Sequence, residues 1–161
     1  KKLTMSHFNH VIDNNMNTVL SVSLKFINIL KSKKETNKIL NISSIMGLRG
    51  SKDSLPYSTA KGGVINLTRC LAVDLAKFNI NVNAICPGFI NTRMALLPDG
   101  SGHEYETEMF KDVYLKHERI PLIRTGISED ISGPAFFLSS KDSDYITGQI
   151  LSVDGGISAT F

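Results

Sequence analysis

Residues 38–61 read KILNISSIMGLRGSKDSLPYSTAK, and this stretch decides the fold class. Its first part, residues 39–42, is a short apolar run of the kind that forms a buried strand. Gly and Ser are frequent over residues 43–55, which predicts a loop. Pro56 then stands where a helix can begin, because the missing N–H of proline costs little in a first helical turn. A strand that passes through a loop into a helix is the basic unit of an α/β fold.

The segments on both sides continue this alternation of helix and strand. Apolar residues recur every three or four positions over residues 4–33 and 56–78, which predicts two long helices with one buried face each. Further strands are predicted at residues 80–86 and 149–153, with a short helix at residues 129–138 between them. The apolar stripe of the first helix consists of Phe8, Val11, Ile12, Val19, Val22, Phe26 and Leu30.

This pattern predicts an α/β fold that forms part of a Rossmann-type, doubly wound parallel sheet with helices on both faces, because parallel strands need crossover connections. We expect one domain over residues 1–161. Three strands are few for such a sheet, so the strand at residues 39–42 is expected to have a further neighbour.

Bulk composition narrows the range of partners. Of the 161 residues, 42% are apolar and 20% are charged, which is ordinary for a globular domain with a core. A net charge of +3 without a basic stripe argues against nucleic-acid binding. No apolar run approaches the roughly 20 residues of a membrane span, and no signal peptide is visible. Cys70 and Cys86 lie in apolar stretches and are expected to be free, buried thiols in a reducing, cytoplasmic compartment.

Tyr57 and Lys61 are the first candidate functional pair. They stand four positions apart on a predicted helix, so their side chains share one face. Tyrosine, with an ordinary pKa of about 10, is a poor base at neutral pH. Since an adjacent ammonium group favours the phenolate, we expect Lys61 to lower the pKa of Tyr57 and to suit it to acid–base catalysis. The alternative is a chance pair on a solvated helix surface.

Two polar residues add to this pair. Ser44 follows the strand at residues 39–42, at the carboxyl end where α/β sheets bind ligands. Taken by itself, Ser44 is better interpreted as a serine that caps the loop. Asn15 falls on the apolar stripe between Ile12 and Val19, where an unpaired amide is costly, so it must bind backbone, water or substrate. A structural asparagine that distorts the helix is the alternative.

Several motifs in this order resemble the short-chain dehydrogenase/reductase family. The first three are Asn41-Ile42-Ser43-Ser44-Ile45-Met46-Gly47, Tyr57-Ser58-Thr59-Ala60-Lys61 and Asn83-Ala84-Ile85-Cys86-Pro87-Gly88-Phe89-Ile90-Asn91-Thr92. Later ones are Ile120-Pro121-Leu122, Phe137-Leu138, Ile146-Thr147-Gly148-Gln149 and Val153-Asp154-Gly155-Gly156. The resemblance covers residues 8–156 and implies hydride transfer between an alcohol or ketone and NAD or NADP.

The resemblance implies a catalytic role for four residues. Tyr57 would exchange a proton with the substrate oxygen, and Lys61 would support it. Ser44 would orient the substrate carbonyl or alcohol and stabilise its developing charge. Asn15 would hold a water that continues the proton relay to solvent. Positioning of this kind contributes much of the rate, since the hydride chemistry belongs to the cofactor.

The resemblance also implies a cofactor-binding set. Lys61, beside Tyr57, would bind the ribose hydroxyls of the nicotinamide half. In the loop that begins with Pro87-Gly88, the backbone at Ile90 and the hydroxyl of Thr92 would bind the carboxamide of the nicotinamide. The cofactor-binding residues implied are thus Tyr57, Lys61, Pro87, Gly88, Ile90 and Thr92.

The match departs from the family in one respect. No Gly-x-Gly-x-x-Gly turn occurs, and that turn is the family's binding site for the pyrophosphate. Members of this family have roughly 250 residues in one domain, whereas this chain has 161 residues. We therefore interpret the chain as the C-terminal, catalytic portion of such an enzyme. By itself it is expected to bind the cofactor poorly, because the helix N-terminus that binds the pyrophosphate is absent.

Residues 94–119 fit the substrate-covering segment of the family, a lid that excludes water. Within and beside it, Met46 and Met94 are expected to contact the substrate together with Ser44. The polar turn at residues 98–102 favours a small polyhydroxy or sugar-like alcohol as substrate. No group of His, Cys, Asp or Glu has a recognised ligand spacing, so no metal is expected.

The leading hypothesis is an NAD(P)-dependent oxidoreductase that interconverts an alcohol and a ketone and acts as a homodimer or homotetramer. The family resemblance implies that the helices at residues 4–33 and 56–78, and the last strand, contact partner subunits. The alternative is a catalytically silent fragment that serves as an oligomerisation module. Because the Ser, Tyr and Lys residues are all present at the family's spacing, the enzyme is favoured.

Overall fold

A parallel three-stranded sheet forms the centre of the protein in the computed structural model, which describes residues 3–159. The strands are β1 (Asn37–Ile42), β2 (Ile80–Pro87) and β3 (Ile150–Val153), in the order β1-β2-β3. Asn37 lies opposite Ile80, and Ala84 lies opposite Ile150. The parallel register confirms the predicted α/β fold, since each strand is reached through a helical crossover.

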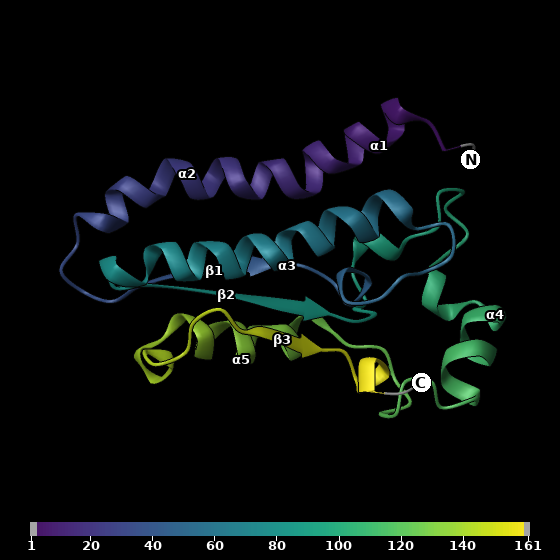
Figure 1. Cartoon of the computed structure of the whole chain (residues 1–161). Coiled ribbons are helices and arrows are strands. Elements are labelled where there is room, and N and C mark those ends of the chain that lie inside the picture. The colour runs from purple at the N-terminus through teal and green to yellow at the C-terminus, as the bar shows by residue number, and fades with distance from the viewer. Residues whose placement is uncertain (1–2, 160–161) are drawn as a thin grey trace.

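Helices cover both faces of this sheet (Figure 1). The helices are α1 (Met5–Ile12), α2 (Thr18–Lys31), α3 (Leu55–Leu75) and α5 (Ser128–Ser139), with the single turn α4 at Glu108–Phe110. On one face α3 packs on β2 and α2 packs on β1, while α5 lies on the other face. The core between the first layer and the sheet consists of Ile27, Leu71, Ala72, Leu75, Ile80 and Val82.

The first predicted helix is interrupted by a π-helical segment at Asp13–Asn17. A π turn contains one residue more than an α turn, so it rotates the helix that follows. After this segment the buried residues are Ser23 and Ile27, whereas Val22 and Phe26 are about half exposed. The four stripe residues of α2 nevertheless share one face, because Val19, Val22, Phe26 and Leu30 all line one groove, in which Val19 and Leu30 are partly buried.

β1 is an edge strand of the sheet formed by the described residues, since its only partner there is β2. An open, mostly apolar groove runs between this edge and α2, with Val22, Phe26 and Ile42 among its lining residues. The further neighbour expected for this strand stays a prediction.

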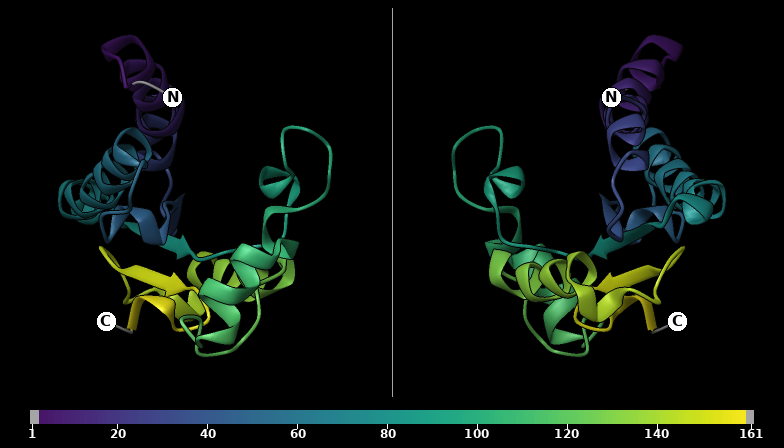
Figure 2. Two further views of the ribbon diagram at one scale, coloured as in Figure 1. Left: turned by 90° about the vertical axis from the view of Figure 1, so that its right-hand side faces the viewer. Right: turned by 90° about the vertical axis from the view of Figure 1, so that its left-hand side faces the viewer.

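The segment predicted to be a lid leaves the sheet after β2 and projects to one side of the molecule before the chain returns (Figure 2). Its first part is a projecting turn closed by a bridge between Leu96 and His103. It continues through a 3-10 turn at Glu104–Glu106, α4 and a π-helical turn at Lys111–Lys116. Phe110 anchors the segment in the protein, with a side chain that is 2% exposed.

Within residues 3–159, no helix combines the length and the apolar character that crossing a membrane requires.

Candidate active site

The carboxyl ends of β1 and β2 open into one cavity of about 640 Å3. This volume lies in the range of pockets that bind small molecules and cofactors. The cavity brings together nine of the ten residues predicted to form the site. They are Ser44, Met46, Tyr57, Lys61, Pro87, Gly88, Ile90, Thr92 and Met94. Residues that are 50 positions apart in the chain meet here because parallel strands place their carboxyl ends at the same edge.

Ser44 is positioned by the turn that follows β1. Its hydroxyl accepts a hydrogen bond from the Met46 N–H at 3.1 Å, so Ser44 is the N-cap of the 3-10 turn Ile45–Gly47. The loop-capping interpretation is thus correct, and it does not exclude the other role. The side chain lies in the cavity, is 9% exposed, and forms a hydrogen bond with Tyr57. Capping fixes the oxygen in place.

Tyr57 and Lys61 lie one turn apart at the start of α3, as predicted. The Lys61 Nζ is 5.6 Å from the centroid of the Tyr57 ring and donates a hydrogen bond to the Ile42 carbonyl oxygen at 3.2 Å. Burial raises the pKa of Tyr57 above its ordinary value, and the hydrogen bond from Ser44 only partly opposes this. The expected lowering of the Tyr57 pKa by Lys61 is therefore not seen, because burial has the larger effect.

Burial also lowers the pKa of Lys61, an effect that the nearby Cys86 opposes. The same burial raises the pKa of the Cys86 thiol, which therefore stays protonated at neutral pH. Cys70 and Cys86 are both free, as the sequence predicts, but only Cys86 is buried; the expectation of burial is wrong for Cys70, which is exposed on α3.

The loop with Ser44 and the helix with Lys61 are held together by close backbone contacts. The Ser43 hydroxyl donates a hydrogen bond to the Lys61 carbonyl oxygen at 2.8 Å. Gly47 lies against the same backbone, and a Cβ at this position would be 2.6 Å from the Lys61 carbonyl carbon. Since real Cβ atoms do not come so near, only glycine permits this approach. The contact sets the distance between Ser44 and the Tyr57–Lys61 pair.

Asn15 is the one predicted site residue that does not line the cavity. It lies in the π-helical segment, and its side-chain amide donates a hydrogen bond to the Val11 carbonyl oxygen at 3.0 Å. This arrangement corresponds to the alternative of a structural asparagine in a distorted helix. The segment packs on α3, where Met16 lies so near Gly63 that a Cβ there would be 2.2 Å from the Met16 sulfur. The relay role of Asn15 stays a prediction.

The loop after β2 contacts two later parts of the chain, at Asp154 and at Gly126. Gly88 packs on Asp154, to whose Cα a Cβ on Gly88 would be 2.8 Å. Ile90 forms a parallel bridge with Gly126, in which the hydrogen bonds use the Phe89 carbonyl and the Asn91 N–H. The N–H and C=O of Ile90 are therefore not used by this bridge.

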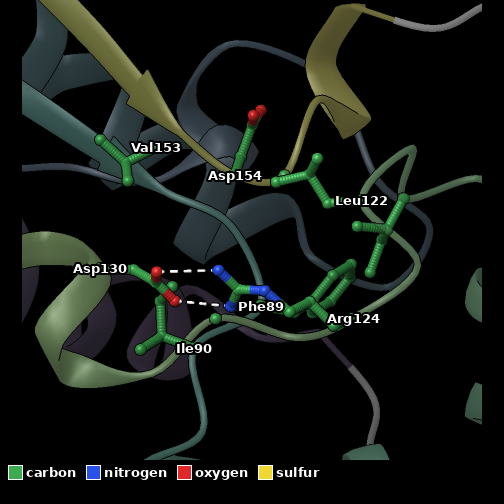
Figure 3. A pocket seen from close by; sticks show the side chains of 10 residues that line it. Phe89, Ile90, Leu122, Arg124, Asp130, Val153 and Asp154 are labelled. Carbon is green, nitrogen blue, oxygen red and sulfur yellow. Dashed lines mark hydrogen bonds and ion pairs between the residues drawn. The ribbon is translucent and has the colours of Figure 1, made fainter.

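An ion pair between Arg124 and Asp130 stabilises the segment that contains Gly126 (Figure 3). The Arg124 guanidinium donates two hydrogen bonds to the Asp130 carboxylate, at 2.7 and 2.9 Å. The Asp130 carboxylate also accepts from the Ile127 N–H at 2.8 Å. These bonds hold the pKa of Asp130 at about 2. Arg124 and Asp130 line a small second cavity behind the loop, together with Phe89, Ile90 and Asp154.

The segment predicted to be a lid, residues 94–119, contributes residues that sequence analysis did not assign to the site. Glu104 and Tyr105 line the cavity, while Met94 stands at its rim with 84% of its surface exposed. No periodic pattern marks Tyr105, because it lies in a 3-10 turn, and only the tyrosines and phenylalanines near it indicate a packed cluster. Within residues 3–159 no three His, Cys, Asp or Glu side chains are grouped as metal ligands.

Known proteins share this arrangement of elements. The family model described as enoyl-(acyl carrier protein) reductase matches residues 1–158. A 3-oxoacyl-[acyl-carrier-protein] reductase of Chlamydia muridarum is 39% identical over 156 residues, which are 97% of this chain and 58% of the relative. A 2-dehydro-3-deoxy-D-gluconate 5-dehydrogenase of Formosa agariphila is 35% identical over 159 residues, which are 99% of this chain and 57% of the relative.

A solved structure gives the same result at the level of the fold. A gluconate 5-dehydrogenase of Burkholderia cenocepacia, in complex with NADP and tartrate, superimposes with a TM-score of 0.87 at 27% identity. The match covers 99% of this chain and 59% of that protein. The chain thus spans somewhat less than two thirds of the length of the relatives it matches. By its sequence match and its fold, the chain belongs to the short-chain dehydrogenase/reductase family.

Proposed function

We propose that the whole protein is an NAD(P)-dependent oxidoreductase that interconverts a small-molecule alcohol and the corresponding ketone. One observation carries this proposal: Ser44, Tyr57 and Lys61 line a single cavity at the carboxyl ends of β1 and β2. The similar reductase and dehydrogenases support it. Their names span protein-bound acyl and sugar-acid substrates, which have in common a ketone or alcohol on an oxygenated chain.

The residues at the cavity fit a nicotinamide cofactor. The Lys61 ammonium group has three donors, and within residues 3–159 it donates one hydrogen bond, to Ile42. Two donors remain for ribose hydroxyls. The N–H and C=O of Ile90 are left unused by the bridge to Gly126, so they suit the carboxamide. The Thr92 hydroxyl accepts from the Met94 N–H at 3.4 Å and keeps its own hydrogen to donate. A bound nicotinamide supplies or accepts the hydride.

Tyr57 carries the proton chemistry of this proposal. With its pKa raised by burial, the phenol is protonated at neutral pH and donates its proton to a substrate carbonyl oxygen during reduction. When substrate binds, Ser44 turns its one hydroxyl hydrogen from Tyr57 to the same substrate oxygen and stabilises the charge that develops there. In the oxidative direction Tyr57 must accept the alcohol proton, and the Lys61 ammonium group then stabilises the phenolate.

The proposal also includes the quaternary structure of the protein and its location in the cell. Exposed apolar side chains on α2 and α3, among them Leu24, Ile29 and Val73, support a homodimer or homotetramer formed through these helices. The two free cysteines support a cytoplasmic location. Light scattering of the whole protein tests the assembly, and the mass of a monomer would contradict it.

Two measurements on the whole protein test the activity. Titration with NADH and NADPH, followed by nicotinamide fluorescence, is expected to give saturable binding of at least one cofactor. Oxidation of the bound cofactor by a panel of hydroxy ketones, 3-oxo esters and keto sugar acids is then expected for at least one class. Cofactor binding without turnover across the panel would favour a catalytically silent protein. Absence of both would contradict the proposed function.

A further inference from the structure

Tyr105 brings a second phenol to the cavity that contains Tyr57. It lies in the 3-10 turn Glu104–Glu106 of the lid, half-buried, and lines the cavity together with Ser44 and Tyr57. Its ring packs at 4.8 Å from the Phe110 ring and at 5.5 Å from the Phe89 ring, measured between centroids. Phe110 is fully buried, so the cluster holds the Tyr105 ring in one place.

A histidine ties Tyr105 to the loop after β2. The buried His103 places its Nε2 3.1 Å from the Thr92 carbonyl oxygen, while its Nδ1 is 3.4 Å from the Tyr105 N–H. A neutral ring with its proton on Nε2 satisfies both contacts, because Nε2 then donates and Nδ1 accepts. The wall that carries Tyr105 is thereby fixed relative to Thr92, on the loop that we assign to the nicotinamide.

The Tyr105 hydroxyl is available to a ligand. Among residues 3–159 no donor or acceptor forms a hydrogen bond with it, although it lies in a cavity with several polar groups. Burial, the neighbouring Glu104 carboxylate and Tyr57 raise the pKa of Tyr105 to about 12. The phenol therefore stays neutral and retains its proton to donate. Both phenols of the cavity are therefore protonated at neutral pH, and the hydrogen bond from Ser44, which lowers the pKa, is made only to Tyr57.

We propose that Tyr105 is a substrate-binding residue that donates a hydrogen bond to a second oxygen of the substrate, beside the carbonyl or alcohol held by Ser44 and Tyr57. This inference rests on the proposed function and narrows it to oxygenated ketones and alcohols. The second oxygen is uncharged, as in a hydroxyl, ester or thioester, because the Glu104 carboxylate on the same wall repels a substrate carboxylate. A site built to donate to this oxygen discriminates against analogues that lack it.

The test compares three ketones in the whole protein and in its Tyr105→Phe variant. Ethyl acetoacetate has a neutral second oxygen, 2-heptanone has the same chain length without it, and acetoacetate has a carboxylate. In the variant we expect kcat/KM for ethyl acetoacetate to fall by about 3- to 10-fold, the value of one neutral hydrogen bond, and that for 2-heptanone to stay within about twofold. Phenylalanine retains the ring packing, and a thermal melt confirms that the variant is folded.

Tyr114→Phe is the matched control. Tyr114 belongs to the same aromatic cluster, with its ring 4.7 Å from that of Phe110, but it does not line the cavity. Its hydroxyl should be dispensable for the preference. The role of Tyr105 would be refuted if Tyr105→Phe lowered kcat/KM equally for ethyl acetoacetate and 2-heptanone, or if the unaltered protein turned over acetoacetate faster than its ester. Either result would leave the proposed function standing. Absence of turnover of all three ketones by the unaltered protein would count against the proposed function as well.

Discussion

Gly47→Ala is the substitution for which the structure predicts the largest effect from the smallest change. A Cβ on Gly47 would be 2.6 Å from the Lys61 carbonyl carbon and 2.7 Å from its oxygen. Ordinary contacts begin at 3.4 Å, so the 3-10 turn must move away from α3 by about 0.8 Å. Both sides of the contact are backbone, and neither can rotate away. Overpacking of this kind costs about 1–3 kcal/mol of the free energy of unfolding.

The same movement separates Ser44 from Tyr57. A displacement of about 1 Å at a reaction centre costs up to about 100-fold in rate, so we expect kcat/KM to fall by about 10- to 100-fold. Gly50→Ala is the control, because a Cβ on Gly50 meets nothing within 4 Å. Urea denaturation and steady-state kinetics of the whole protein provide the two measurements. The reasoning is refuted if the Gly47 and Gly50 variants show the same stability and the same kcat/KM.

Two further predictions concern stability. Thr68→Val removes the acceptor of the Asn41 amide, a buried bond of 2.9 Å, so the free energy of unfolding should fall by about 1–3 kcal/mol in urea denaturation; an unchanged value would contradict this. Arg124 holds the pKa of Asp130 at about 2, below its ordinary value. The ionised carboxylate therefore stabilises the folded protein above about pH 4, and this stabilisation is lost as the pH falls towards 2. Asp130→Asn should thus reduce the loss of melting temperature between these pH values, and an identical decline in both proteins would show that the pair does not contribute.

The central sheet and most of the site could be predicted from the sequence because short-range patterns determine them. The apolar run at residues 39–42 lies within β1, and the run at residues 80–86 lies within β2. Once these strands are parallel, the residues just after each must meet at one edge. Ser44 and Thr92 line the same cavity, although no pattern in the sequence links them directly.

What the sequence could not predict depends on one-residue insertions and on tertiary burial. The π-helical segment at Asp13–Asn17 adds one residue to a turn, and no pattern in the sequence marks it. The direction of the Tyr57 pKa follows from how deeply the ring is buried, whereas the sequence shows only the spacing to Lys61. Tyr105 reaches the cavity through the fold of residues 94–119, which local patterns do not encode.

The central claim is that Ser44, Tyr57 and Lys61 form the reaction centre, and one measurement tests it most directly. This measurement is the turnover number of the Tyr57→Phe variant of the whole protein, with cofactor affinity measured in parallel by nicotinamide fluorescence. Loss of the phenol proton is expected to lower kcat by at least about 100-fold, since general acid catalysis contributes about 10²- to 10⁴-fold. Cofactor binding and the melting temperature should change little, because the ring remains. A folded variant that retains most of its turnover would contradict the assignment of Tyr57 as the acid/base.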